Sequence, residues 1–169
     1  MKNNVIFLTG LFSMLMFSVV NVNAESNSTD NQNVTIDSIK RLNPDTLFDA
    51  APYAFSQVVI PPEGTTVYIS GQGAIDVNGN VVGDTLEEQL PIVFQNLKFA
   101  LEASGSTSEH IVKAQIFIAD YQQEQLEIYL SEAKKFFGND LPASILIPVP
   151  RLALDDMLVE IDVTVVIPN

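Results

Sequence analysis

Few residues of this chain can carry covalent chemistry. Its 169 residues include no cysteine and a single histidine, His110, so neither a thiolate nor a pair of imidazoles is available for catalysis or metal binding. His110 precedes an apolar run and is expected to be an exposed residue at the start of a strand. Ser144 lies outside any Gly-x-Ser-x-Gly turn, which disfavours a serine nucleophile. With no glycine-rich phosphate loop or metal-ligand spacing, the sequence predicts no metal and no cofactor.

The first 24 residues have the pattern of a cleavable secretory signal peptide. A short segment with Lys2 precedes an apolar stretch over residues 5–20, and Val22-Asn23-Ala24 supplies the small-residue cleavage site. An uncleaved membrane anchor is the alternative, but the apolar stretch is shorter than the roughly 20 residues of a spanning helix. We therefore expect cleavage after Ala24, export to the periplasm or the medium, and no membrane attachment of the mature protein.

The mature chain is strongly acidic. Cleavage removes Lys2, so 7 basic and 21 acidic residues remain and the formal charge becomes −14. Such a surface repels the phosphate backbone of nucleic acids and also opposes binding to anionic membranes. The sequence therefore predicts no nucleic-acid partner.

Residues 25–41 are predicted to form a flexible polar linker, and residues 42–169 a single folded domain. The segment after Ala24 is almost devoid of large apolar side chains and cannot bury a core by itself. The remaining length is right for one domain with a substantial core.

Hydrophobic periodicity within the domain predicts strands, a helix, a strand, a second helix and two final strands. Residues 55–60 and 65–70 are expected to pair as a hairpin around Pro61-Pro62-Glu63-Gly64. Asn78-Gly79 marks a two-residue turn. The first helix is expected to start after Thr85 with a capping box to Glu88, to bend at Pro91 and to end at Gly105. The other expected elements are strands at 74–77, 112–119, 144–149 and 158–167, and a helix over 122–137.

This order of elements predicts an α+β fold with one sheet backed by two helices. The strand over 144–149 is apolar on both faces, and the last strand carries Leu158 and Val166 on the face opposite its main apolar stripe. Helices on one side cannot cover all of that surface, so another subunit is expected to cover the rest.

Several short motifs resemble, in order and spacing, the Rid family, also called RidA/YjgF-like and formerly L-PSP endoribonucleases. The resemblance runs from about Asn43 to Pro168. The motifs are Phe55-Ser56-Gln57, Val67-Tyr68-Ile69-Ser70-Gly71-Gln72, Gln95-Asn96-Leu97-Lys98, Leu101-Glu102-Ala103-Ser104-Gly105, Val112-Lys113, Pro142-Ala143 and Leu158-Val159-Glu160-Ile161.

The resemblance implies a chorismate-mutase-like fold with one mixed sheet, assembled as a homotrimer with a barrel-like core. It also implies ligand pockets in the clefts between subunits. Active members hydrolyse enamines and imines such as 2-iminopropanoate to keto acids and ammonia. They hold the substrate carboxylate with an arginine in the motif Pro-Ala-Arg-Ser, because a guanidinium forms a bidentate pair with a carboxylate.

The pocket positions of this chain depart from that pattern. Ser144 takes the place of the arginine, Phe55 that of a tyrosine, Leu146 that of a cysteine and Leu130 that of an asparagine. The resemblance therefore implies a neutral and partly apolar site for an unknown small molecule, and it disfavours imine hydrolysis. An active deaminase is the alternative.

The resemblance assigns a ligand-lining backbone to Ser70 and Gly71, and a water-positioning carboxylate to Glu160. Each residue also has a simpler interpretation. Glu160 alternates with Asp162 on one face of a strand and could be an ordinary outward-facing charge. Ser70 and Gly71 could serve only a turn, and Ser144 could simply fill the space of the lost arginine.

Overall fold

The computed structural model describes residues 37–169, so the predicted signal peptide and most of the predicted linker lie outside the described residues. The first strand starts at Lys40, slightly ahead of the predicted domain start at Leu42. The elements are β1 (Lys40–Leu42), η1 (Ala51–Tyr53), β2 (Val58–Ile60), β3 (Gly64–Gly73), α1 (Leu86–Ala103), η2 (Ser108–His110), β4 (Ile111–Ala119), α2 (Gln125–Phe137), β5 (Ala143–Val149) and β6 (Val159–Pro168). No helix of the described part is both long and apolar enough to cross a membrane.

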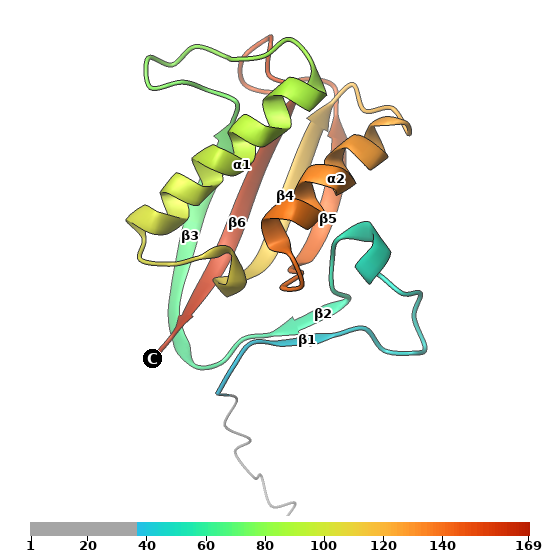
Figure 1. Cartoon of the computed structure of the whole chain (residues 1–169), viewed down its shortest axis with the longest axis vertical. Helices are drawn as coiled ribbons and strands as arrows, with labels where there is room; N and C mark the ends of the chain where they lie inside the picture. The colour runs from blue at the N-terminus through green and yellow to red at the C-terminus, as the bar shows by residue number, and fades with distance from the viewer. Residues whose placement is uncertain (1–36) are drawn as a thin grey trace, which may run out of the picture. The chain divides into compact units, whose positions relative to one another are not determined.

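The main sheet has four strands in the order β3-β6-β4-β5. Its pairs are antiparallel except for β4 and β5, which are parallel and are joined through α2. Both helices lie across the same face of this sheet (Figure 1). The predicted α+β architecture of one mixed sheet backed by two helices is therefore confirmed.

The core lies between this face and the helices. Alternate residues of β6, from Val159 to Val165, are almost completely buried, and so are Ile116 and Ile118 of β4. The apolar side chains of α1 recur at helical spacing and are buried against them: Leu90, Val93, Leu97 and Leu101. Side chains from strands and helices thus fill one continuous core.

The ends of α1 follow the predicted signals. The Thr85 hydroxyl accepts a hydrogen bond from the Glu88 backbone N–H, and the Glu88 carboxylate accepts one from the Thr85 backbone N–H, which completes the capping box. The helix continues without a break through Pro91. At its other end Gly105 has a φ of 73°, and Ser106 N–H donates to the Leu101 carbonyl. This is a Schellman ending, which requires the left-handed backbone that glycine tolerates.

The predicted hairpin of residues 55–60 with 65–70 is wrong. β2 pairs with β1, whereas β3 pairs with β6 across the main sheet. Pro61 and Pro62 supply no backbone N–H and keep the chain extended, so β2 runs on into β3 in place of folding back on it. The strand expected at 74–77 is reduced to a single bridge between Ile75 and Val81 around the predicted Asn78-Gly79 turn.

The sheet face opposite the helices is open in the single chain. Tyr68 is 81% exposed on this face, and the edge residue Ile145 is 47% exposed. At the centre of the face the Gln115 side-chain amide donates to both carboxylate oxygens of Asp162 at 3.1 Å. We call this surface the open face below.

Candidate functional site

A cavity of about 480 Å³ lies between β5, the N-terminal half of α2 and the loop around η1. We call it the aromatic pocket. Three aromatic rings of its lining come from the loop and a fourth comes from α2. Strand β5 contributes two aliphatic side chains and one serine. The lining residues are Phe48, Tyr53, Phe55, Ile116, Leu126, Tyr129, Ser144, Ile145 and Leu146.

The loop supplies an aromatic wall made of Phe48, Tyr53 and Phe55. The ring of Phe48 meets each of the other two edge-on, with centroids 5.9 Å apart in both pairs. This is a favourable geometry for aromatic rings. Ala54 separates Tyr53 from Phe55 and is buried in the left-handed conformation with a φ of 59°. That turn of the backbone lets rings on both sides of Ala54 line one cavity.

The motif Phe55-Ser56-Gln57 also fixes this wall to the domain. Ser56 is buried, and its hydroxyl donates to the Leu141 carbonyl at 2.7 Å while its backbone N–H donates to the Pro142 carbonyl at 2.9 Å. The side-chain amide of Gln57 donates to the Phe48 carbonyl at 3.0 Å. Leu141 and Pro142 lead directly into β5, so these bonds hold the aromatic wall beside Ser144.

The opposite side of the pocket comes from β5 and α2. Ser144 and Leu146 lie in register with Ala114 and Ile116 of β4, and so they face the helices. Tyr129 of α2 is 3% exposed, and its hydroxyl has no hydrogen-bond partner among the described residues. Burial raises the pKa of Tyr129 above its usual value, so the hydroxyl stays protonated well into the alkaline range. The lining contains neither lysine nor arginine.

The aromatic pocket opens at an edge of the sheet. β5 is the last strand of the sheet order, and Ile145 lines the pocket although it alternates with Ser144 and Leu146 along the strand. Lining residues therefore come from both sides of an edge strand. A neighbouring chain packed against this edge would close the pocket.

Glu160 lies elsewhere, on the open face. It pairs with Phe117 of β4 and Gly73 of β3, between the inward-facing Val159 and Ile161. Its side chain lies across Gly71: a Cβ atom at Gly71 would be 1.8 Å from Glu160 Oε1. Only glycine permits so close an approach. We call Ser70, Gly71 and Glu160 the Glu160 site.

The structure thus divides the predicted site residues between two places. Phe55, Ser144 and Leu146 share the aromatic pocket, whereas Ser70 and Gly71 lie with Glu160. Glu160 on β6 is two strands, about 10 Å, from β5, and Ser70 and Gly71 on β3 are three strands away. Glu160 and the pocket residues also face opposite sides of the sheet. One small molecule cannot contact both groups within one chain.

Leu130 belongs to neither group. It is 3% exposed in the core of the domain, and the pocket lining takes its neighbour Tyr129 instead. Sequence reasoning missed Tyr129, Phe48, Tyr53 and Leu126. The signal for Tyr129 and Leu126 was their spacing of three residues on one face of a helix. His110 is half-buried at the end of η2, where its Nδ1 accepts a hydrogen bond from Thr107 N–H.

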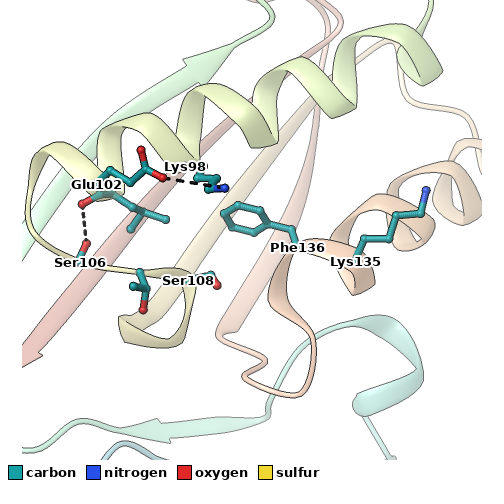
Figure 2. A pocket seen from close by; sticks show the side chains of 8 residues that line it. Lys98, Glu102, Ser106, Ser108, Lys135 and Phe136 are labelled. Carbon is teal, nitrogen blue, oxygen red and sulfur yellow. Dashed lines mark hydrogen bonds and ion pairs between the residues drawn. The ribbon is translucent and has the colours of Figure 1, made fainter.

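A second hollow of about 290 Å³ lies between α1, α2 and η2 (Figure 2). Figure 2 shows Lys98 and Phe136 reaching into the space between the two helices. Lys98 lies 4.0 Å from Glu102, and Lys135 is paired with Glu132. Because each lysine has a carboxylate beside it, the hollow does not concentrate positive charge, and we assign no ligand to it.

A mixed four-stranded sheet with two helices on one face and a pocket at its parallel edge defines a class of small α+β domains. The family model described as Endoribonuclease L-PSP matches residues 48–167. The chain therefore belongs to this family, which is also named Rid or YjgF-like.

Similar proteins agree with this membership. A RutC family protein of Saccharolobus solfataricus is 37% identical over 103 residues, covering 59% of this chain and 78% of the relative. A 2-iminobutanoate/2-iminopropanoate deaminase of Dermatophagoides farinae is 33% identical over 105 residues, covering 62% and 77%. The crystal structure of a Rid-family protein of unknown function from Yersinia pestis superposes with a TM-score of 0.75 at 31% identity, covering 77% of this chain and 99% of that chain.

Proposed function

We propose that this protein binds a small uncharged molecule in clefts between the subunits of a homotrimer and does not hydrolyse imines efficiently. The observation that carries the proposal is the lining of the aromatic pocket. It has Ser144 where the family resemblance expects an arginine, and it contains no basic residue. A carboxylate moved from water into such a pocket loses its hydration without gaining a cationic partner, which is strongly unfavourable.

The trimer is proposed because the candidate site is divided within one chain. The aromatic pocket opens at the edge strand β5, and the Glu160 site lies on the open face. Packing the open face of one chain against the β5 edge of the next would cover Tyr68 and Ile145 and bring a Glu160 site to each pocket. Sedimentation equilibrium at several concentrations tests this: we expect three chains per particle, and a monomer over the whole range would contradict it.

Export is proposed because residues 1–24 match a secretory signal peptide. Intact mass measurement of the protein collected outside the cytoplasm is expected to show a chain that begins at Glu25. An exported protein would be separated from the cytoplasmic enzymes that release short-lived imines, which agrees with the loss of the arginine.

The experiment for the function is an imine-trapping assay. An amino-acid oxidase generates 2-iminopropanoate from alanine, and semicarbazide traps the imine that survives. We expect the purified trimer to leave the amount of trapped product unchanged, because Ser144 cannot hold the substrate carboxylate. A clear, concentration-dependent drop in trapped product would contradict the binding-only function.

That drop would support the alternative function, a deaminase of 2-iminopropanoate-type intermediates. The observation that favours it is the 33% identity to a protein named as such a deaminase. Cleavage of RNA, which the family description names, is disfavoured because the formal charge of −13, or −14 after the proposed cleavage, repels a phosphate backbone.

A further inference from the structure

Arg41 is an enclosed charge in an exposed part of the chain. It lies in the middle of β1, which pairs only with β2 and stays outside the main sheet (Figure 1). Its neighbours Lys40 and Leu42 are exposed, whereas the Arg41 side chain is only 15% exposed. A guanidinium removed from water costs free energy unless acceptors pair with its N–H groups. The enclosure of Arg41 is therefore explained by what it holds.

The guanidinium of Arg41 joins β1 to two other segments. Its Nη2 donates to the Glu109 carbonyl of η2 at 2.6 Å, and its Nη1 lies 3.3 Å from the Asp140 carboxylate. Asp140 belongs to the connection between α2 and β5. Hydrogen bonds from a guanidinium to a carboxylate are stronger than those between neutral groups. Arg41 thus fastens β1 to the connection that leads into the pocket strand β5.

The same connection holds the loop that carries the aromatic wall. The two carbonyls that directly follow Asp140 accept hydrogen bonds from the hydroxyl and the backbone N–H of Ser56. The base of the loop is closed by a bond of 2.9 Å from Gln57 N–H to the side-chain oxygen of Asn43, two residues after Arg41. The loop is therefore fastened near both of its ends to the α2–β5 connection.

Burial of its own side chains does little to fix this loop. Leu47, Phe48 and Tyr53 are 51%, 61% and 47% exposed. Side chains that remain so exposed gain only part of the free energy of apolar burial. Segments with few buried apolar contacts open locally at a low free energy. The position of the aromatic wall therefore depends on the polar bonds at the ends of the loop.

We propose that Arg41 is a positioning residue of the aromatic pocket: its bonds to Glu109 and Asp140 keep the loop in the arrangement that binds a ligand. Arg41 does not line the pocket and acts through the loop. When the loop is open the pocket lacks a wall, so the apparent affinity falls with the fraction of closed loop. The effect on affinity rests on the binding function proposed above, whereas the effect on the loop does not.

The test compares Arg41→Gln and Arg41→Lys with the natural protein, each as the full assembled chain. Arg151→Gln is the matched control, because Arg151 forms an exposed ion pair with Asp155, at 3.1 Å, and contacts neither the loop nor the α2–β5 connection. Hydrogen exchange at the Ser56 and Gln57 amides reports on the loop. A ligand-observed NMR titration with acetophenone, a small neutral aromatic compound, reports on the pocket, and thermal unfolding reports on the whole domain.

In Arg41→Gln we expect exchange at Ser56 and Gln57 to be about tenfold faster and the affinity for acetophenone to be about fivefold lower. The buried amides of β6 should exchange as slowly as in the natural protein. Arg41→Lys should restore part of both effects, because an ammonium keeps the charge beside Asp140 but lacks the fork that reaches both partners. Arg151→Gln should change neither measurement.

Unchanged exchange at Ser56 and Gln57 in Arg41→Gln would overturn the proposal. Equal acceleration throughout the domain, with a lower melting temperature and an unchanged affinity, would also overturn it, since Arg41 would then only stabilise the fold. Faster exchange of the loop alone with an unchanged affinity would show that the loop does not set binding, and would overturn the role in the pocket. If acetophenone does not bind even the natural protein, the neutral-ligand function fails, and the exchange result still decides whether Arg41 holds the wall.

Discussion

The aromatic pocket and the Glu160 site are built in different ways. The pocket wall is an irregular loop. Side-chain hydrogen bonds from Ser56 and Gln57 hold it in place, and Ala54 turns it through a left-handed backbone conformation. The Glu160 site lies within the main sheet, where the pairing of β3 with β6 shifts register between Ile69 and Gln72 and a glycine lets a carboxylate lie across the backbone. By the family resemblance, the pocket is also the half that departs from the family pattern, at Phe55, Ser144 and Leu146, whereas Ser70, Gly71 and Glu160 match it. Under the function proposed above, the ligand would differ from that of active members while the carboxylate half would be retained.

The largest expected effect concerns the support of the Glu160 site. Gln89 is fully buried, and its amide donates to the carbonyls of Gly83 and Asp156 while its oxygen accepts from Leu158 N–H, all within 2.9 Å. Gln89→Leu keeps the volume but leaves three backbone groups without partners, so we expect about 3 kcal/mol loss in the free energy of unfolding. Denaturant unfolding measures this loss.

Gln89→Leu also tests whether the Glu160 site and the aromatic pocket unfold independently. Hydrogen exchange should accelerate at residues 156–160 and remain slow at Ser56 in the pocket wall. Gln95→Leu on the exposed side of α1 is the control and should change stability by less than about 0.5 kcal/mol. Equal acceleration in both regions would show that they unfold together and that the contrast has no energetic basis.

The next effect concerns the ligand preference of the pocket. Ser144→Arg places a guanidinium in the lining, and we expect pyruvate, a carboxylate probe, to bind at least about tenfold more tightly than to the natural protein. Ser144→Lys is the matched control, because it adds the charge without the bidentate geometry and should give a smaller gain. Calorimetric titration measures all three affinities. No gain with arginine would mean that residue 144 does not face the ligand.

Loosening the pocket wall is expected to have a smaller effect on stability. Ser56→Ala removes the hydroxyl bond to the Leu141 carbonyl but leaves the backbone bond to Pro142, so we expect a loss of about 1 kcal/mol. Thermal unfolding measures it, with the exposed Ser131→Ala of α2 as control. The affinity for acetophenone, used here as a neutral aromatic probe of the pocket, should fall in Ser56→Ala and not in the control. If Ser56→Ala loses the expected stability but binds the probe as tightly as the natural protein, Ser56 supports the fold but not the aromatic wall.

The smallest effect concerns the contact between Gly71 and Glu160. Gly71→Ala brings a Cβ atom against the flexible end of Glu160, so the carboxylate has to change rotamer at a cost of about 0.5 kcal/mol. In a Glu160→Ala background the same substitution should cost nothing. Comparing the four proteins in a double-mutant cycle measures the difference. Equal costs in both backgrounds would mean that alanine strains the strand itself.

Sequence patterns predicted the fold better than the site. The periodicity of the helices, the capping box at Thr85 and the Gly105 ending depend on neighbouring residues, and all were correct. The predicted partner of β3 was wrong, because the pairing of β3 with β6 joins residues about a hundred positions apart and has no local sequence signal. The place of Leu130 shows the same limit. Motif alignment locates a helix position, but the face that meets the pocket depends on how α2 packs, and it is Tyr129 that lines the cavity.

The two edges of the sheet bear on how the protein is made. β3 and β5 end the sheet, so each has one side without a strand partner in the part of the chain that is described. Unpaired strand edges promote aggregation, and Pro148 in β5 only partly protects one of them by lacking a backbone N–H. An exported chain that assembles would fold outside the cytoplasm and at high dilution. The time that each folded chain spends alone before it meets another would then limit the yield of soluble protein.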